Sequence, residues 1–568
     1  MNRDLISLSE RTFDVLVVGG GIHGVLCAWD AVLRGLSVAL IERGDFGSAT
    51  SQNSLKTIHG GLRYLKDGNF RRIRSMANER RTWMKIAPHL VHPLTCVTPT
   101  YHSLVEGRHA MSAALGINDL LSYDRNRLPD PEKHLPGGYL LPRQDLARMI
   151  PNFDLSGVTG VAVWHDAQVY NTERLLLSFV ISSVQAGAVM ANYVEAYDLL
   201  QTGSKLSGVK ARDVLTGEVI EIKARVVINA SGAWIDQLLS SLDKPRAWQN
   251  FIPSVAINLV TRQLWSGFAA GLRSDPKKRL ATGARSHPSQ MFFISPWRQY
   301  SLIGTWHIPW PHSPDEFIIS EKILQDFIDE VNTCHPALNL SLDDILHVHW
   351  GFLPAYENSV PDQNVKLVRE GVVLDHQLDF HLDGLISVLG VKYTTARLIA
   401  QQALDLVVKK LGIQAPPCQT HLEPVWGGRI ERFNDFLENA LEEAPYDLGQ
   451  DIIHHLVYTY GSEYTTILDS MKNEPSLRMR ILESSPVTKA EVAHAIRGEM
   501  VQNLVDIIQR RTELGSAGLP PPEALQTCSL LLAEKRGWDE ARINKSLEEV
   551  HASYPFKQVA GNHYAFAS

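Results

Sequence analysis

Apolar residues follow three patterns along this chain, each typical of a different kind of structure. Four short, continuous apolar runs predict parallel strands that are buried on both faces: 13–18, 38–41, 224–230 and 385–389. Alternating, aromatic-rich segments between about 248 and 349 predict antiparallel sheet. Helical periodicity marks 69–87 and 172–185 and prevails from about 420 onward.

Glycines follow the first apolar run at a spacing typical of dinucleotide-binding proteins. Gly19, Gly21 and Gly24 fit the pattern G-x-G-x-x-G where the strand turns into a helix. Such glycines allow a tight turn and let a pyrophosphate approach bare backbone at the positive end of the helix. Glu42 ends the second strand, where a carboxylate accepts hydrogen bonds from the adenosine ribose. Together these features predict a Rossmann-like nucleotide site.

A loop rich in small and polar residues, 43–54, follows the second strand. It contains Arg43, Thr50 and Ser51 and leads to Lys56. A nicotinamide nucleotide has little need for such a loop here, whereas the diphosphate and ribityl chain of FAD needs hydrogen-bond donors. The loop therefore favours FAD, although an ordinary hydrated loop explains its composition equally well.

Two later strands end in turns that we place at the same site. The strand at 224–230 runs into Gly232, and the strand at 385–389 runs into Gly390. Ligands of open α/β sheets collect at the carboxyl ends of the strands. The nucleotide-binding domain is therefore predicted to be assembled from distant parts of the chain.

The predicted fold class is α/β, with a Rossmann-like FAD-binding domain, an interleaved antiparallel-sheet substrate cap and a C-terminal all-helical domain. The segments assigned to the FAD-binding domain are 12–66, 153–236 and 345–410. Those assigned to the cap are 67–152 and 237–344. Residues 420–568 form the helical domain, in which the apolar residues of 488–511 predict a helical face that is buried.

Composition and charge indicate an ordinary globular protein. Apolar residues make up 44% and charged residues 21%, and a net charge of -7 argues against a nucleic-acid partner. No apolar stretch reaches the roughly 18 residues that a membrane span needs, and residues 1–10 lack a secretory pattern. The five cysteines show neither metal-site nor disulfide spacing. We expect a cytoplasmic protein without a metal, in which contact with the inner face of the cell membrane is at most peripheral.

Six cations gather in the helix predicted at 69–87: Arg71, Arg72, Arg74, Arg80, Arg81 and Lys85. Glu79 and apolar residues lie between them, as on a solvated face of an ordinary amphipathic helix. Contact with a membrane surface or another polyanion is the alternative. We favour the solvated face.

Several motifs, in order, resemble the FAD-dependent glycerol-3-phosphate dehydrogenase family, within the flavoproteins that include D-amino-acid oxidase. Besides the glycine turn, they are IHGGLRYL at 58–65, NASGAW at 229–234, PW at 296–297, IGT at 303–305, Lys392 with Arg397, and RRT at 510–512. The segments at 59–65 and 510–512 are the most specific. The resemblance covers most of the chain and implies an FAD-dependent oxidoreductase.

The resemblance also implies the residues of the site. Those at the cofactor would be Gly19, Gly21, Gly24, Glu42, Arg43, Thr50, Ser51, Lys56, Gly60, Gly61, Val194, Gly232, Gly390, Lys392, Thr394 and Thr395. Those at the reacting atoms would be His59, Arg63, Tyr64, His307 and Lys392. Oxidation of an alcohol removes a proton and a hydride, so a proton path must face flavin N5 across the substrate.

A phosphorylated substrate needs fixed cations, and Arg63 and Lys392 fit that need. For Arg63 the alternative is a structural ion pair. For His59 a role beside the flavin and a merely packed imidazole are about equally supported.

The chain departs from the family at positions implied to lie in the substrate pocket. Leu353 stands where the family motif S-G-x-R-P has arginine, and His307 where G-T-T-D has aspartate. The segment 254–257 replaces K-G-x-H, and the turn from Gly390 lacks a second glycine and the tyrosine before Arg397. Cofactor positions largely match while pocket positions differ, as expected of a related flavoenzyme with a different substrate.

Three functions follow as hypotheses. The leading one is oxidation of a C–OH group of a small polyol phosphate, with hydride transfer to flavin and electrons passed to a quinone or another acceptor. The second keeps FAD but oxidises a different hydroxy or amino compound. The third is a flavin-binding scaffold without turnover, against which Lys392, Arg63 and His59 argue. Association into a homodimer is a further expectation.

Overall fold

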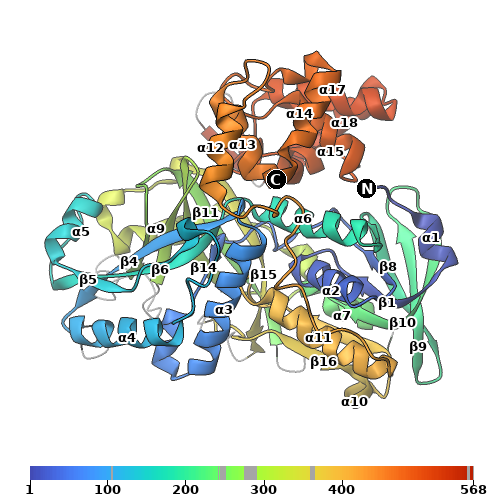
Figure 1. Cartoon of the computed structure of the whole chain (residues 1–568), viewed down its shortest axis with the longest axis horizontal. Coiled ribbons are helices and arrows are strands. Elements are labelled where there is room, and N and C mark those ends of the chain that lie inside the picture. Colours follow the sequence, from blue (N-terminus) through green and yellow to red (C-terminus); the bar gives the residue numbers. More distant parts are fainter. Residues whose placement is uncertain are drawn as a thin grey trace.

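Two large sheets lie side by side in the computed structural model, and a helical domain lies across them (Figure 1). The structure describes residues 1–103, 107–240, 242, 251–273, 291–357, 365–554, 556–559 and 563–566. The predicted cap and helical domain extend over some residues outside these ranges, among them 243–250, 274–290 and 560–562.

The first sheet has a parallel centre, as the four continuous apolar runs predict. Its main path is β16 (Val372–Asp375), β17 (Leu385–Leu389), β10 (Val219–Asn229), β1 (Thr12–Val18), β2 (Val38–Ile41) and β7 (Val189–Ala191). Antiparallel strands β8 (Val194–Thr202) and β9 (Lys205–Asp213) extend it from β10. Because β1 pairs in parallel with β2 and β10, and β10 with β17, their carboxyl ends meet at one edge.

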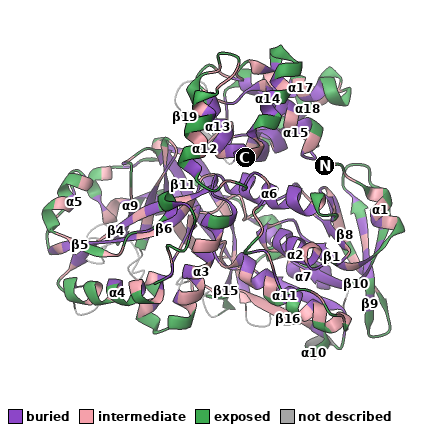
Figure 2. Ribbon diagram, in the orientation of Figure 1, coloured by how far each residue is buried: buried purple, intermediate pink, exposed green. Residues whose placement is uncertain are grey.

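Helices cover both faces of this sheet. On one face, α2 (Ile22–Leu33) packs against α6 (Thr172–Gln185) and α11 (Ala396–Leu411). Most of α2 and α6 is buried (Figure 2), and α2 is accordingly apolar nearly all round, whereas α6 also buries polar side chains. On the other face, short helices α1 (Leu5–Glu10) and α7 (Ile235–Leu239) complete a second apolar core.

The second sheet confirms the antiparallel pattern. Its path is β15 (Ile345–Tyr356), β11 (Phe251–Arg262), β14 (Tyr300–Pro309), β13 (Met291–Trp297), β12 (Ala269–Arg273), β4 (Val91–Tyr101), β6 (Val158–Val169) and β3 (Thr57–Ile58). β5 (Tyr139–Leu141) also pairs with β6, and only the β12–β4 pair in this described path is parallel. Around it lie α3 (Phe70–Ile86), α4 (Arg108–Leu121), α5 (Arg143–Met149) and α9 (Glu321–Cys334) (Figure 1).

Strand pairing moves the predicted domain boundaries. The predicted FAD-binding segments 153–236 and 345–410 include β6 and β15, yet both strands pair in the second sheet. The periodicity of a strand identifies the element but not its partner, which depends on contacts far away in sequence. The polypeptide therefore crosses between the two sheets more often than the predicted boundaries imply.

The C-terminal region is helical, as predicted, apart from a terminal two-stranded ribbon. Its helices are α12 (Phe433–Glu442), α13 (Gln450–Tyr460), α14 (Tyr464–Asn473), α15 (Lys489–Gly498), α16 (Leu504–Asp506), α17 (Pro522–Arg536) and α18 (Glu540–Ala552). The ribbon pairs β18 (Phe556–Val559) with β19 (His563–Phe566). Within the part of the chain that the structure describes, no helix has both the length and the apolar character required to cross a bilayer.

The apolar face predicted at 488–511 is buried, but the segment is not one continuous helix. It consists of α15, a break, α16 and a π-helical turn, η10 (Ile507–Arg511). Met500 takes a left-handed conformation (φ 54°), and the side chain of Asp506 accepts a hydrogen bond from the backbone N–H of Asn503 (3.0 Å). A capping box thus starts a new helix in the middle of the apolar pattern.

Four of the six cations of α3 pair with carboxylates and two, Arg71 and Lys85, are exposed, so the predicted solvated cationic face is only partly present. Arg74 and Arg81 both bind the carboxylate of Asp124. Arg80 is buried and lies 2.8 Å from the carboxylate of Asp166. Carboxylates from distant segments, which a local charge pattern does not reveal, thus compensate part of the positive charge of this helix.

Candidate active site

A cavity of about 600 Å³ lies where β1, β10 and β17 end. One side of its wall is made by turns of the first sheet and by the polar loop that follows β2. The opposite side is made by β11 and β15 of the second sheet. The cavity therefore lies between the two sheets, at the edge where ligands of α/β sheets bind.

The glycine turn after β1 brings three pieces of backbone very close together. A Cβ atom on Gly19, whose φ is +111°, would lie 2.5 Å from the carbonyl oxygen of Ala230. A Cβ on Gly24 would lie 1.9 Å from the carbonyl oxygen of Gly19. A Cβ on Gly21 would instead have its nearest neighbour, Ser51 Oγ, at 3.3 Å, and Gly21 lines the cavity. The outer glycines thus shape the turn, while Gly21 leaves space for a ligand.

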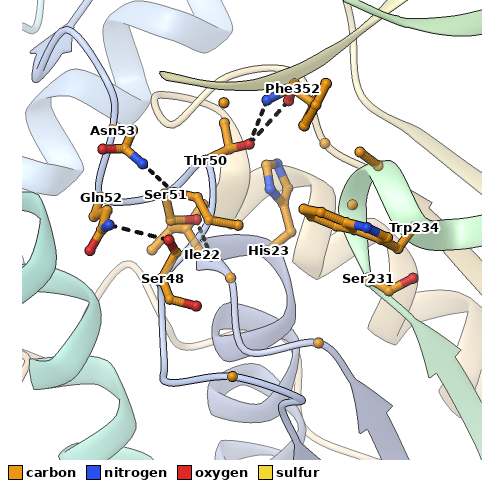
Figure 3. Close-up of a pocket in the computed structure, with 18 of the residues that line it drawn as sticks. Ile22, His23, Ser48, Thr50, Ser51, Gln52, Asn53, Ser231, Trp234 and Phe352 are labelled. Atoms are coloured by element: carbon orange, nitrogen blue, oxygen red, sulfur yellow. Dashed lines mark hydrogen bonds between the residues drawn. The ribbon is translucent and has the colours of Figure 1, made fainter. Parts of the chain in front are cut away.

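The polar loop is tied to both sides of the cavity (Figure 3). The N–H of Ile22, at the start of α2, donates to Ser51 Oγ (2.9 Å). The N–H of Phe352 on β15 donates to Thr50 Oγ1 (2.9 Å). A third bond runs from Asn258 Nδ2 on β11 to the carbonyl of Asn53 (3.1 Å). These bonds hold the hydroxyl-bearing loop against the open centre of the cavity.

Glu42 lines the cavity and also fastens the turn. Its carboxylate accepts hydrogen bonds from the backbone N–H groups of Gly20 (2.6 Å) and Gly44 (2.8 Å). Burial raises the pKa of Glu42 despite these bonds. Because each carboxylate oxygen has two lone pairs, acceptor capacity remains for a ribose hydroxyl. The ribose contact stays a prediction.

Cations gather around Tyr64, and of these only Lys392 is among the described residues that line the cavity. Its Nζ contacts the hydroxyl of Tyr64 and donates to the carbonyl of Arg369 (3.1 Å). Burial lowers the pKa of Lys392 to about 8. The guanidinium of Arg63 lies 5.1 Å from the Tyr64 ring centre, and Arg72 lies 3.9 Å from it. Burial raises the pKa of Tyr64, but these charges outweigh it and lower the pKa overall.

His307 belongs to the same neighbourhood. It is directly opposite Ala256 in the β11–β14 ladder, and Ala256 lines the cavity. Burial, together with a smaller effect of the charge of Arg63, lowers the pKa of His307 to about 4. Its Nδ1 has no hydrogen-bond partner among the described residues. His307 is therefore neutral at pH 7, with an unused ring nitrogen.

Some predicted cofactor residues lie behind the wall. Lys56 is buried and its Nζ donates to Thr172 Oγ1 (2.7 Å) and Glu173 (3.0 Å), which attaches the polar loop to α6. The Gly60 N–H donates to Asp166 (2.6 Å). Gly61, in a left-handed conformation, begins the 3₁₀ helix η1 (Leu62–Asp67). These residues support the wall without lining the cavity.

His59 and the two threonines also support the wall. The N–H of His59 donates to Thr394 Oγ1 (3.2 Å), and the indole of Trp83 donates to the Thr394 carbonyl (2.9 Å). The His59 ring lies 3.4 Å from Asp166, so it forms an ion pair when it is protonated. Thr395 precedes α11 as its N-cap.

Ten of the predicted cofactor residues do line the cavity, and their contact with the cofactor stays a prediction: Gly19, Gly21, Glu42, Arg43, Thr50, Ser51, Val194, Gly232, Gly390 and Lys392. Sequence reasoning passes over His23, Trp234 and Phe352, which also line it (Figure 3). A polar residue inside the glycine motif was a usable signal for His23. Phe352 has no local signal, because strand pairing brings it to the cavity.

The wall fits FAD. The lining combines bare glycine backbone, the hydroxyl and amide side chains of the polar loop, and the ammonium of Lys392. The Nε2 of His23 is buried without a partner, as expected of a group that meets a polar ligand. Burial lowers the pKa of His23 to about 4, so the ring is neutral. When bound, FAD supplies the acceptor for a hydride.

Comparisons with known proteins give the class and then the family. Residues 14–402 match the family described as FAD dependent oxidoreductase, and residues 418–543 match the C-terminal domain of alpha-glycerophosphate oxidase. The protein is an FAD-dependent oxidoreductase. It is 31% identical to a glycerol-3-phosphate dehydrogenase of Synechocystis sp., over 97% of each chain. The mitochondrial glycerol-3-phosphate dehydrogenase of Saccharomyces cerevisiae is 28% identical over 96% of this chain and 90% of its own.

The fold has solved counterparts. The structure of the glycerol-3-phosphate dehydrogenase from Bacillus halodurans, complexed with FAD, superposes with a TM-score of 0.73 over 97% of each chain, at 23% identity. The chain thus belongs to the FAD-dependent glycerol-3-phosphate dehydrogenase family, which confirms the resemblance, the fold class and the cofactor.

Proposed function

We propose that the protein oxidises the secondary alcohol of glycerol 3-phosphate. The observation that carries the proposal is the group of cations around Tyr64, of which Lys392 lines the cavity and Arg63 and Arg72 lie beside it, since a phosphate needs fixed positive charge. The names of the curated relatives support the same substrate.

In this proposal, protonated Lys392 and Arg63 hold the phosphate, and the Tyr64 hydroxyl orients Lys392. The neutral imidazole of His307 accepts the proton of the substrate hydroxyl at Nδ1, which lacks a partner among the described residues. Orientation of this kind lowers the barrier by placing the carbon that loses a hydride at the flavin. The roles of these residues, and that of His59 through its pair with Asp166, are proposals.

The direct test is reduction of the bound flavin without oxygen. We expect glycerol 3-phosphate to bleach the visible flavin absorbance of the purified holoprotein, because hydride transfer leaves the flavin reduced. Dithionite serves as the control for a reducible flavin. A flavin that dithionite reduces and saturating glycerol 3-phosphate does not would exclude this substrate, and it would favour another substrate or a scaffold.

A second candidate is oxidation of another hydroxy or amino compound. Three departures from the family motifs lie together on adjacent strands: Ala256 is opposite His307, and Ser254 is opposite Leu353. Ala256 and Leu353 line the cavity. A substituted patch beside the cavity favours a different substrate. The same anaerobic assay with a panel of hydroxy acids and amino acids separates the two candidates.

Replacing Arg63 by alanine tests the phosphate site. We expect FAD to be retained and the KM for glycerol 3-phosphate to rise about 10-fold or more, because a charge-assisted contact contributes about 1.5–3 kcal/mol. Steady-state kinetics measure the change. Arg71→Ala, which removes an exposed cation of α3, is the matched control. Unchanged kinetics in Arg63→Ala would mean that Arg63 serves only as a structural cation.

The electron acceptor and the location complete the proposal. We infer a cytoplasmic enzyme in peripheral contact with the inner face of the membrane, where electrons pass to a quinone or another acceptor. In support, Leu120 (73% exposed) and Tyr123 (66%) on and after α4, together with Phe70 at the start of α3, present apolar side chains to solvent. Arg71, the next residue after Phe70, adds an exposed cation. Association into a homodimer stays a prediction.

A further inference from the structure

The Arg510-Arg511 pair is the most specific motif of the C-terminal domain, yet the active site described above gives it no role. Both residues end the π-helical turn η10, and their side chains are 5% and 1% exposed. They point out of their own domain toward Asp45. This residue is fully buried and lies near the start of the 43–54 polar loop of the nucleotide-binding domain. Three buried charges from positions more than 460 residues apart thus meet at the domain interface.

The carboxylate of Asp45 is held on all sides. Arg511 donates through Nη1 (2.7 Å) and Nη2 (2.8 Å), in the two-pronged geometry that arginine forms with carboxylates. Arg510 Nε donates to the same group (2.5 Å), and so does Asn192 Nδ2 (2.8 Å). Burial acts to raise the pKa of Asp45, but the two arginines outweigh it and hold the pKa well below its ordinary value.

The arginines are themselves fixed by further contacts. Arg511 Nε donates to the carbonyl of Glu499 (3.1 Å), whose carboxylate pairs with Arg174 of α6 (2.5 Å). Arg510 Nη2 donates to Asp506 (2.8 Å). The pair therefore meets Asp45 with little remaining freedom.

Hydrogen bonds connect Asp45 to the residues that line the cavity, so fixing Asp45 also restricts those residues. Its carbonyl accepts from the N–H of Ser48 (3.1 Å), and the adjacent Gly47 N–H donates to the carbonyl of Gly20 in the glycine turn (3.0 Å). Arg510 Nη1 also lies 3.5 Å from Oε1 of Gln52. Ser48 and Gln52 line the cavity, and so does Gln509, which belongs to the C-terminal domain. The C-terminal domain thus contacts the loop at its start and in its middle.

We propose that the C-terminal domain is a positioning element for FAD: the Arg510–Arg511 pair holds Asp45 and thereby fixes the 45–54 loop in the conformation that binds the cofactor. Docking of this domain and retention of FAD are then coupled. Coupling between two binding equilibria is reciprocal, so FAD must strengthen docking by the same factor by which docking strengthens FAD binding. The proposal rests on FAD as the cofactor and is independent of the substrate.

The first measurement is the FAD dissociation constant of full-length Arg511→Met and Arg511→Lys proteins, by flavin fluorescence after reversible removal of FAD. We expect Arg511→Met to weaken binding about 10-fold or more. Arg511→Lys should fall between it and the wild type, because lysine keeps the charge but lacks the planar fork. Should Arg511→Met fail to fold by circular dichroism, Arg511→Lys still decides, since loss of the fork alone should weaken FAD binding measurably.

The matched control is Arg298→Met. Arg298 also joins the C-terminal domain to the rest of the chain, through Glu513 (3.3 Å) and Ser516 (3.0 Å), but at the turn between β13 and β14. We expect this control to lower the melting temperature while its FAD dissociation constant stays within about two-fold of the wild-type value. Equal FAD affinities in Arg298→Met and Arg511→Met would overturn the proposal, because general loosening of the interface would then explain the effect.

Hydrogen–deuterium exchange tests the reciprocal direction. Adding FAD to the wild-type apoprotein should slow amide exchange in 45–54 and in 504–511 together. In Arg511→Met, FAD at saturating concentration should slow exchange in 45–54 only. Unchanged exchange at 504–511 in the wild type would also overturn the coupling. A wild-type chain that binds no FAD at all would instead contradict the oxidoreductase function itself.

Discussion

Valine at position 21 is expected to yield a folded protein without FAD. Gly21 has φ -73° and ψ 173°, a conformation open to any residue, so Gly21→Val need not strain the backbone. Its Cβ would lie 3.3 Å from Ser51 Oγ, and the two methyl groups would extend into the space that we assign to the pyrophosphate. The ratio of flavin absorbance to protein absorbance after purification measures the loss.

Two other glycines frame this result. Gly116→Val is the control. Gly116 lies on the exposed helix α4, and a Cβ atom added there would have no neighbouring atom within 4 Å. It should retain FAD. Gly24→Val should fail to fold, because its Cβ would meet the carbonyl oxygen of Gly19 at 1.9 Å. Full FAD content in Gly21→Val would show that the pyrophosphate does not pass this turn.

Methionine at position 392 should keep FAD bound and remove most turnover. Lys392→Met roughly preserves the length of the side chain but removes its positive charge from the cavity wall. Loss of a charge-assisted contact costs about 1.5–3 kcal/mol. This corresponds to a decrease of roughly 10- to 150-fold in kcat/KM. Steady-state kinetics on FAD-loaded protein measure it, with Lys85→Met on exposed α3 surface as the control.

The same lysine predicts the pH dependence. Burial lowers the pKa of Lys392 from 10.5 to about 8, and lysine is charged below its pKa. As the pH rises through about 8, the ammonium loses its proton and its hold on the phosphate, so kcat/KM should fall. This fall should be absent from Lys392→Met. A wild-type kcat/KM that instead increases through this window would identify the neutral amine as the active form, and Lys392 would then be a base.

Local chemistry made the nucleotide half of the site predictable. A strand, three glycines, a helix and Glu42 follow one another within about 30 residues, and their geometry depends on backbone sterics and helix capping close by in sequence. The turns at Gly232 and Gly390 could be placed for a similar reason, because small residues after a buried strand point to the carboxyl edge of a parallel sheet.

Other features depended on partners far away. The family resemblance implies that Lys56 contacts the cofactor, but in the structure its ammonium pairs with the carboxylate of Glu173, more than a hundred residues later. Arg74 and Arg81 look solvated until Asp124 is placed between them. The charge pattern of one segment does not reveal which oppositely charged side chains from distant segments will pair with it in the folded protein.

The sequence by itself determined the glycine turn and the buried parallel strands, because these follow from short-range rules of backbone and side-chain geometry. The FAD cofactor was implied by the resemblance of several motifs to a known family, and the composition of the polar loop alone did not decide it. Only the tertiary structure decided that Ala256, His307 and Leu353 form one patch beside the cavity. It also decided that Arg510 and Arg511 reach Asp45 at the cofactor loop. The physical reason is the same in both cases: strand register and domain docking are set by burial of side chains that are hundreds of residues apart.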